Sequence, residues 1–100
     1  MQEEDEHRLA LAWSYQTLNL PDMPFEKSNA ELEAALAEYL NRLVVEDFNK
    51  LVAILYRIDV EQEKAVAELA EYSKRETAGE TLARLIINRQ KQKLRFRKLQ

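Results

Sequence analysis

This chain of 100 residues contains only one glycine, together with two prolines and no cysteine. Two-residue hairpin turns depend on glycine, so a sheet built from hairpins would lack its usual turn residue. The same scarcity excludes a glycine-rich phosphate loop, and the absence of cysteine excludes a disulfide framework and a thiolate zinc site. No segment alternates apolar and polar residues over a useful length. The composition therefore favours helices.

Helix-start signatures recur along the chain. A capping box pairs a residue that accepts the third helical N–H with a Glu or Gln that reaches back to the cap. Asp47 is a further candidate N-cap, because its short carboxylate can accept unpaired N–H groups. We expect helices near residues 4–18 and 29–45, and further helices after each later signal. Three pairs fit the box pattern: Ser28 with Glu31, Asp59 with Gln62, and Thr77 with Glu80.

The sequence predicts an all-α protein, a small antiparallel bundle of four or five helices. Apolar residues after Asp47 cover a wide arc of a helical wheel, which predicts that this helix is central and most buried. Gly79 falls in the first turn of the last helix, where it costs up to about 1 kcal/mol relative to Ala. We expect another helix to approach it closely. The predicted core comprises Leu36, Leu40, Leu43, Phe48, Leu51, Val52, Leu55, Ile58, Val66, Leu69, Leu82, Leu85 and Ile86.

The chain is long enough for one domain. We expect residues 1–28 to form an N-terminal helix plus a proline-containing connector, an extension whose packing on the remainder the sequence leaves open. Residues 29–100 form the helical bundle, which ends in a basic helix.

Few residues that carry chemistry remain. With one histidine there is no multi-His metal site, and Glu4-x-x-His7 is the sole match to the motif of di-iron bundles. The sequence therefore predicts no enzyme, no catalytic residue, no metal and no cofactor. Its acidic start is unlike a secretory signal, and no apolar run is long enough for a membrane helix. We expect a cytoplasmic protein with no membrane partner.

Charge is distributed unevenly. Residues 1–80 have a formal charge of −10, whereas residues 81–100 carry +7 and hold no acidic residue. The basic segment has three alternative roles: it folds onto acidic surface of its own chain or of a twin (such as residues 3–6 or 61–71), it binds RNA, or it docks on an acidic protein or anionic lipid. A pI near 5.2 argues against nucleic acid, and we favour the first role.

Two stretches resemble other sequences. Residues 47–60, and residues 76–80 followed by 85–87 and a basic end, are similar to a set of small uncharacterised bacterial proteins, chiefly of Bacteroidota. The resemblance covers roughly residues 30–98. It implies an all-helical cytoplasmic protein of a group with no assigned activity, and it transfers no catalytic residue.

The leading hypothesis is a non-enzymatic interaction module that binds a second copy of itself, as a homodimer, or another protein through helix faces. The alternative is an RNA- or ribosome-associated protein that uses the basic helix 84–98. Arg57 either forms a groove edge with Tyr56 or pairs with an internal carboxylate near Asp59, and we favour the internal pair. The candidate interaction residues are Trp13, Tyr15, Tyr56, Arg57, Arg84, Arg89, Lys91, Lys93, Arg95, Phe96, Arg97 and Lys98.

Overall fold

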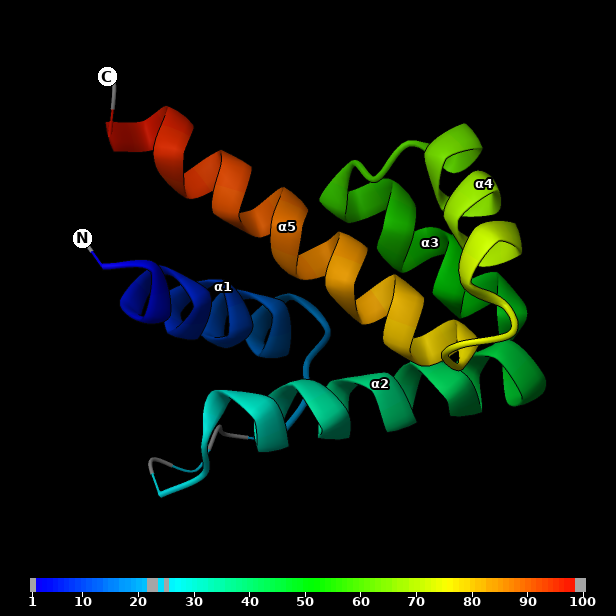
Figure 1. Cartoon of the computed structure of the whole chain (residues 1–100), viewed down its shortest axis with the longest axis horizontal. Coiled ribbons are helices and arrows are strands. Elements are labelled where there is room, and N and C mark those ends of the chain that lie inside the picture. Colours follow the sequence, from blue (N-terminus) through cyan, green and yellow to red (C-terminus); the bar gives the residue numbers. More distant parts are fainter. Residues whose placement is uncertain (1, 22–23, 25, 99–100) are drawn as a thin grey trace.

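The structure, a computed structural model, describes residues 2–21, 24 and 26–98 of the chain. Five helices account for most of these residues, and the described part contains no strand (Figure 1). The predicted all-α fold is therefore confirmed. The helices are α1 (Glu3–Thr17), α2 (Asn29–Glu46), α3 (Phe48–Ile58), α4 (Gln62–Tyr72) and α5 (Ala78–Lys98).

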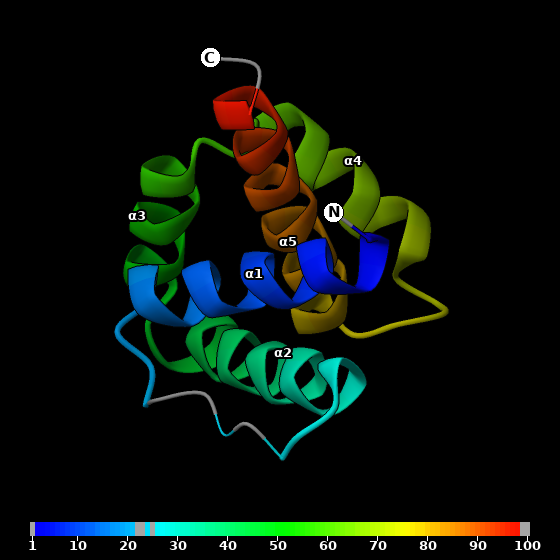
Figure 2. The same ribbon diagram turned by 90° about the vertical axis from the view of Figure 1, so that its left-hand side faces the viewer.

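The longest helix, α5, is the centre of the molecule. It contacts each of the other four helices. Figure 2 shows α5 between α3 and α4, with α1 crossing in front of it and α2 below. Its first half is buried on nearly every side, whereas the second half emerges beside α1. The prediction that the helix after Asp47 is the most buried was wrong.

The N-terminal helix belongs to the same core as the rest of the chain. Ala10 and Leu11 of α1 are fully buried, and α1 packs on both α2 and α5. The Tyr15 hydroxyl donates a hydrogen bond to the Leu32 carbonyl oxygen at 2.8 Å. Burial raises the pKa of Tyr15 above its ordinary value. These contacts join α1 to α2 across the intervening connector.

Most of the predicted core residues lie inside. Leu55 and Leu69 are half-buried against the core. Phe48, Val52 and Val66 were predicted wrongly, since their side chains are 59%, 49% and 60% exposed. On α3 only one side of the wide apolar arc meets α2 and α5, and the remaining part faces outward. The confirmed core residues are Leu36, Leu40, Leu43, Leu51, Ile58, Leu82, Leu85 and Ile86.

Local signals placed three helix starts correctly. The Glu31 N–H donates to the Ser28 hydroxyl at 3.1 Å, and the Ser28 N–H donates to the Glu31 carboxylate at 3.1 Å. The reciprocal pair of Thr77 and Glu80 opens α5 with distances of 2.8 and 3.1 Å. The Asp47 carboxylate accepts from the third N–H of α3 at 3.1 Å.

The predicted capping box at Asp59 was wrong. Asp59 ends α3 in the left-handed conformation, with φ 68°, and the Val60 N–H reaches back to the Leu55 carbonyl oxygen at 3.0 Å. This is the Schellman arrangement, which favours glycine at the left-handed position. Asn19 takes the same conformation after α1, with φ 55°. Because the chain has only one glycine, Asn and Asp, which tolerate this region best, end two of its helices.

The single glycine marks the closest approach of two helices, as predicted. A Cβ built on Gly79 would overlap the Ala37 carbonyl oxygen and lie 2.7 Å from the Asn41 side-chain carbon. The Gly79 N–H also donates to the Asn41 side-chain oxygen at 2.7 Å. The beginning of α5 is thereby held directly against α2.

Candidate functional site

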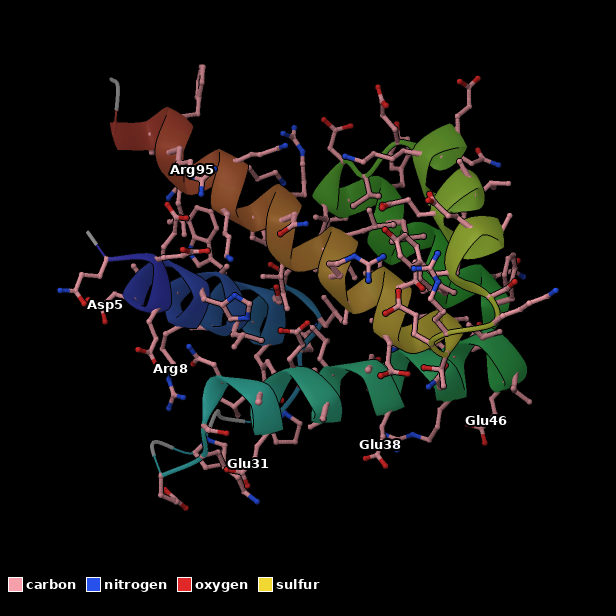
Figure 3. All side chains as sticks on the ribbon, viewed as in Figure 1. Asp5, Arg8, Glu31, Glu38, Glu46 and Arg95 are labelled. Atoms are coloured by element: carbon pink, nitrogen blue, oxygen red, sulfur yellow. The ribbon has the colours of Figure 1, made fainter. Side chains whose placement is uncertain are left out.

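The basic end of α5 folds onto acidic groups of its own chain, as we favoured. Arg95 donates two hydrogen bonds to the Glu6 carboxylate of α1, at 2.7 and 3.1 Å. Figure 3 shows Arg95 on the last turns of α5, above the beginning of α1. These bonds raise the pKa of Arg95. The Arg95 guanidinium therefore links the last turns of α5 to the beginning of α1.

Arg84 lies about three helical turns before Arg95 on α5 and is held by residues of α4 and of the loop after α4. Its Nη1 lies 2.5 Å from a Glu76 oxygen, and its Nη2 lies 3.8 Å from Glu68. The guanidinium stacks over the Tyr72 ring at 4.4 Å. Hydrogen bonds from Thr81 and Arg84 lower the pKa of Glu76. This cluster pins α4 to α5 and gives Arg84 carboxylate partners within its own chain.

The turn at Asp59 is tied to α5 by Arg89 rather than by Arg57. Arg89 donates to the Asp59 carbonyl oxygen at 3.1 Å and to its carboxylate at 2.9 Å. The predicted internal carboxylate pair of Arg57 was wrong, because Arg57 forms no ion pair with a described residue. Its guanidinium instead donates to the Thr17 carbonyl oxygen at 3.4 Å, at the end of α1.

A groove of about 920 Å³ lies between the end of α1, the end of α3 and the second half of α5. In Figure 2 these three segments surround the upper left part of the molecule. Four cationic side chains line the groove, and no carboxylate does among the residues that the structure describes. The lining consists of Trp13, Gln16, Thr17, Arg57, Ile58, Arg89, Gln90, Gln92, Lys93, Phe96 and Arg97, and we call it the cationic groove.

Lys93 is the lysine of the cationic groove. It is half-buried on α5, and within the described chain it has no hydrogen bond and no ion pair. Burial lowers the pKa of Lys93, and the positive charges of Arg89 and Arg97 lower it further, while the Asp59 carboxylate partly opposes them. The fold thus keeps an ammonium group beside two like charges, where a bound anion would relieve the remaining repulsion.

The cationic groove also has an aromatic component. Trp13, the only tryptophan, reaches it from α1, and the Arg97 guanidinium lies 4.3 Å from the centre of its ring. Phe96 lines the same groove and is 63% exposed. Flat apolar rings beside cations allow both charge pairing and stacking on a ligand.

Six of the twelve predicted interaction residues meet in the cationic groove, namely Trp13, Arg57, Arg89, Lys93, Phe96 and Arg97. The others do not. Tyr56 is 87% exposed outside the groove, Tyr15 is buried, and Lys91 lies on α5 outside the lining. Arg84 and Arg95 are held by carboxylates, and the Lys98 side chain lies outside the described residues.

The polar lining of the cationic groove was not predicted from the sequence. Gln16, Gln90 and Gln92 contribute amide groups to it. Gln16 follows Trp13 by three residues, a spacing that places both on one helix face. That spacing was the only local signal for this set.

The described residues include no group of three or more His, Asp or Glu side chains placed to hold a metal ion. None of the helices in this part of the chain has the length and apolar character that a bilayer crossing requires.

The chain matches no protein-family model, and no curated protein or solved structure shows significant similarity to it. The resemblance to small bacterial helical proteins stays a prediction. Function is therefore argued from the cationic groove.

Proposed function

We propose that this protein is a non-enzymatic interaction module that binds an anionic partner in the cationic groove. One observation carries the proposal: four cations from two helices line one groove whose described lining holds no carboxylate, and only Arg89 among them forms an ion pair with a described residue, Asp59. Clusters of one charge sign in a recess concentrate the field and attract ligands of opposite charge.

The ion pairs of two other cations of α5 support this proposal. Arg84 and Arg95 each have a carboxylate within 2.7 Å, so the fold has acidic groups in reach of α5. Lys93 has no such partner in the described chain although 18 acidic residues are present in the sequence. A ligand anion would supply the missing countercharge.

Titration of the purified protein with anionic polymers tests the proposal. Trp13 is an internal reporter, because it is the only tryptophan and lines the cationic groove. We expect polyglutamate, heparin or poly(U) to change its fluorescence at about 50 mM salt, with affinity that falls as salt rises. Failure of all three polymers to bind would contradict the proposal.

A matched pair of variants locates the binding surface. Lys93→Glu and Lys91→Glu make the same charge change two positions apart on α5, but only Lys93 lines the cationic groove. We expect Lys93→Glu to lower affinity about tenfold or more and Lys91→Glu to lower it much less. Equal losses in the two variants would show that binding depends on net charge alone.

Self-association is a second candidate function, favoured by a different observation. Phe48, Val52 and Tyr56 recur every fourth residue on α3 and are 59%, 49% and 87% exposed. A second copy of the chain could cover this apolar face. Light scattering at tens of micromolar protein tests it, and a monomer mass at that concentration would remove it.

A further inference from the structure

We propose that the occupant of the cationic groove is a single-stranded nucleic acid, with its phosphates on the row of cations and a base against the aromatic side chains. This inference rests on the function proposed above, because it assumes that the cationic groove binds an anion. It adds the chemical class of the partner.

The cations of the cationic groove form a row. Arg89, Lys93 and Arg97 recur every fourth residue, so they lie along one face of α5, where Arg89 also pairs with Asp59 and the other two form no ion pair with a described residue. With a rise of 1.5 Å per residue, successive side chains leave the helix about 6 Å apart along its axis. Arg57 adds a charge from α3 on the opposite wall. A row of separated charges suits a ligand with repeated anionic groups better than one with a single carboxylate or phosphate.

The aromatic lining distinguishes nucleic acid from an acidic peptide. Phe96 stands between Arg95 and Arg97 in the sequence, lines the cationic groove and is 63% exposed. Trp13 presents a second ring, which Arg97 covers at 4.3 Å. Bases stack on such rings with little dependence on sequence, while the side chains of an acidic peptide offer no comparable flat surface.

One glutamine of the cationic groove fits a base edge as well. Gln16 is exposed, and its amide carries both donors and an acceptor. Gln90 is 3% exposed and the Gln92 side-chain oxygen already accepts from Arg89 at 3.2 Å, so these two are less available. Base edges present donors and acceptors together.

The size of the cationic groove and its aromatic lining favour a single strand over a duplex. A groove of about 920 Å³ is near the upper size of small-ligand sites, which suits a few nucleotides. The bases of a duplex are paired and stacked on one another, whereas a single strand exposes bases that can stack on the ring of Phe96.

Fluorescence anisotropy with labelled probes of about ten nucleotides tests the inference. The probes are a mixed-sequence RNA, the DNA of the same sequence, an abasic strand of equal length and a duplex, with polyglutamate as competitor. We expect the RNA or DNA strand to bind about 5- to 150-fold more tightly than the abasic strand, which is the gain from stacking one base. A preference for RNA over DNA would identify the sugar, and equal affinity would assign single strands of either kind.

Two aromatic variants separate stacking from charge. We expect Phe96→Ala to weaken binding of the base-containing strand about 5- to 150-fold and to leave the abasic strand unaffected. Tyr56→Ala is the matched control, because Tyr56 is an exposed aromatic residue outside the cationic groove, and it should change neither affinity. Both side chains are largely exposed, so the variants are expected to fold.

The outcomes keep the two proposals apart. Equal binding of abasic and base-containing strands, or binding of polyglutamate in preference to every nucleic acid probe, would overturn the inference and leave an anion-binding groove. A duplex that binds more tightly than the single strand would overturn it also. Binding of no anionic polymer would remove the proposed function itself.

Discussion

The cations of α5 form two sets that face different surroundings. Arg84 and Arg95 are eleven residues apart, three helical turns, and both point at carboxylates of α1, of α4 or of the loop after it. Lys93 and Arg97 lie on another side of the same helix and line the cationic groove, where no described carboxylate is present. One helix therefore carries both an internal clamp and the proposed binding surface.

This difference shows that the total charge of a segment does not determine its role. The +7 of residues 81–100 predicts attraction to something acidic, but not which cations the protein itself neutralises. The paired set should stabilise the fold, whereas Lys93 should destabilise it slightly until an anion binds. Four predictions test this division.

The largest effect is expected from Arg84→Ala. The variant removes the partner of Glu76 and Glu68 and the cation over Tyr72. Hydrogen bonds to charged groups contribute about 1.5–3 kcal/mol, and partial exposure reduces this to about 1–2 kcal/mol here. Urea denaturation should show this loss in the free energy of unfolding. An unchanged midpoint would mean that the Arg84 cluster is not a clamp.

Glu6→Gln should lower the melting temperature, by less than Arg84→Ala does. The amide keeps the shape of the carboxylate but loses the charge that faces Arg95, whose side chain is 62% exposed and screened by water. Asp5→Asn is the matched control, since Asp5 is exposed and Figure 3 shows it directed away from α5. Thermal unfolding should separate the two variants. Equal melting temperatures would show that the bond to Arg95 adds nothing.

A pH series isolates the contribution of Glu76. Its pKa is lowered in the folded protein by Thr81 and Arg84, so the carboxylate binds a proton less readily than it does in the unfolded chain. Its stabilisation is complete above the ordinary glutamate pKa of about 4.3 and is lost as pH falls through the lower folded pKa. The stability difference between the wild-type protein and Glu76→Gln should be constant near neutral pH and should shrink in acid. A difference that grows in acid would contradict the assignment.

Local signals in the sequence predicted a large part of the fold. The capping pairs at Ser28 and Thr77 act over three residues, so the sequence alone reveals them. Glycine is costly inside a helix, and its presence at position 79 therefore indicated that another helix comes close there. Asp59 was misjudged because its carboxylate suits an N-cap, whereas the backbone needed a residue that tolerates positive φ. With one glycine in the chain, that requirement prevailed.

The site was less predictable for a physical reason. The cationic groove brings together Trp13, Arg57 and Lys93. Each of these residues follows the previous one by about 40 positions in the sequence. Their meeting depends on how α1 and α3 pack on α5, and no local pattern encodes that. The basic segment indicated which helix carries the candidate site, but not which face of that helix remains without carboxylate partners.

The smallest effect is also the most specific to a binding role. Lys93→Gln removes an ammonium group whose pKa is lowered by burial and by Arg89 and Arg97. Because the folded state binds this proton less readily than the unfolded state, the charge opposes folding at neutral pH. We expect the variant to raise stability by about 0.2–0.5 kcal/mol, the range of an ordinary surface substitution. Lys91→Gln, outside the cationic groove, should leave stability unchanged.

The same two variants should rank in the opposite order when a polyanion is present. Lys93→Gln should bind it several-fold more weakly, and the rise in melting temperature that the polyanion gives the wild-type protein should shrink. A residue that lowers the stability of the free protein but raises the affinity for a ligand has a role in binding rather than in folding. A variant that is less stable than the wild type without ligand would instead make Lys93 part of the clamp, and the division of α5 into two cationic sets would fail.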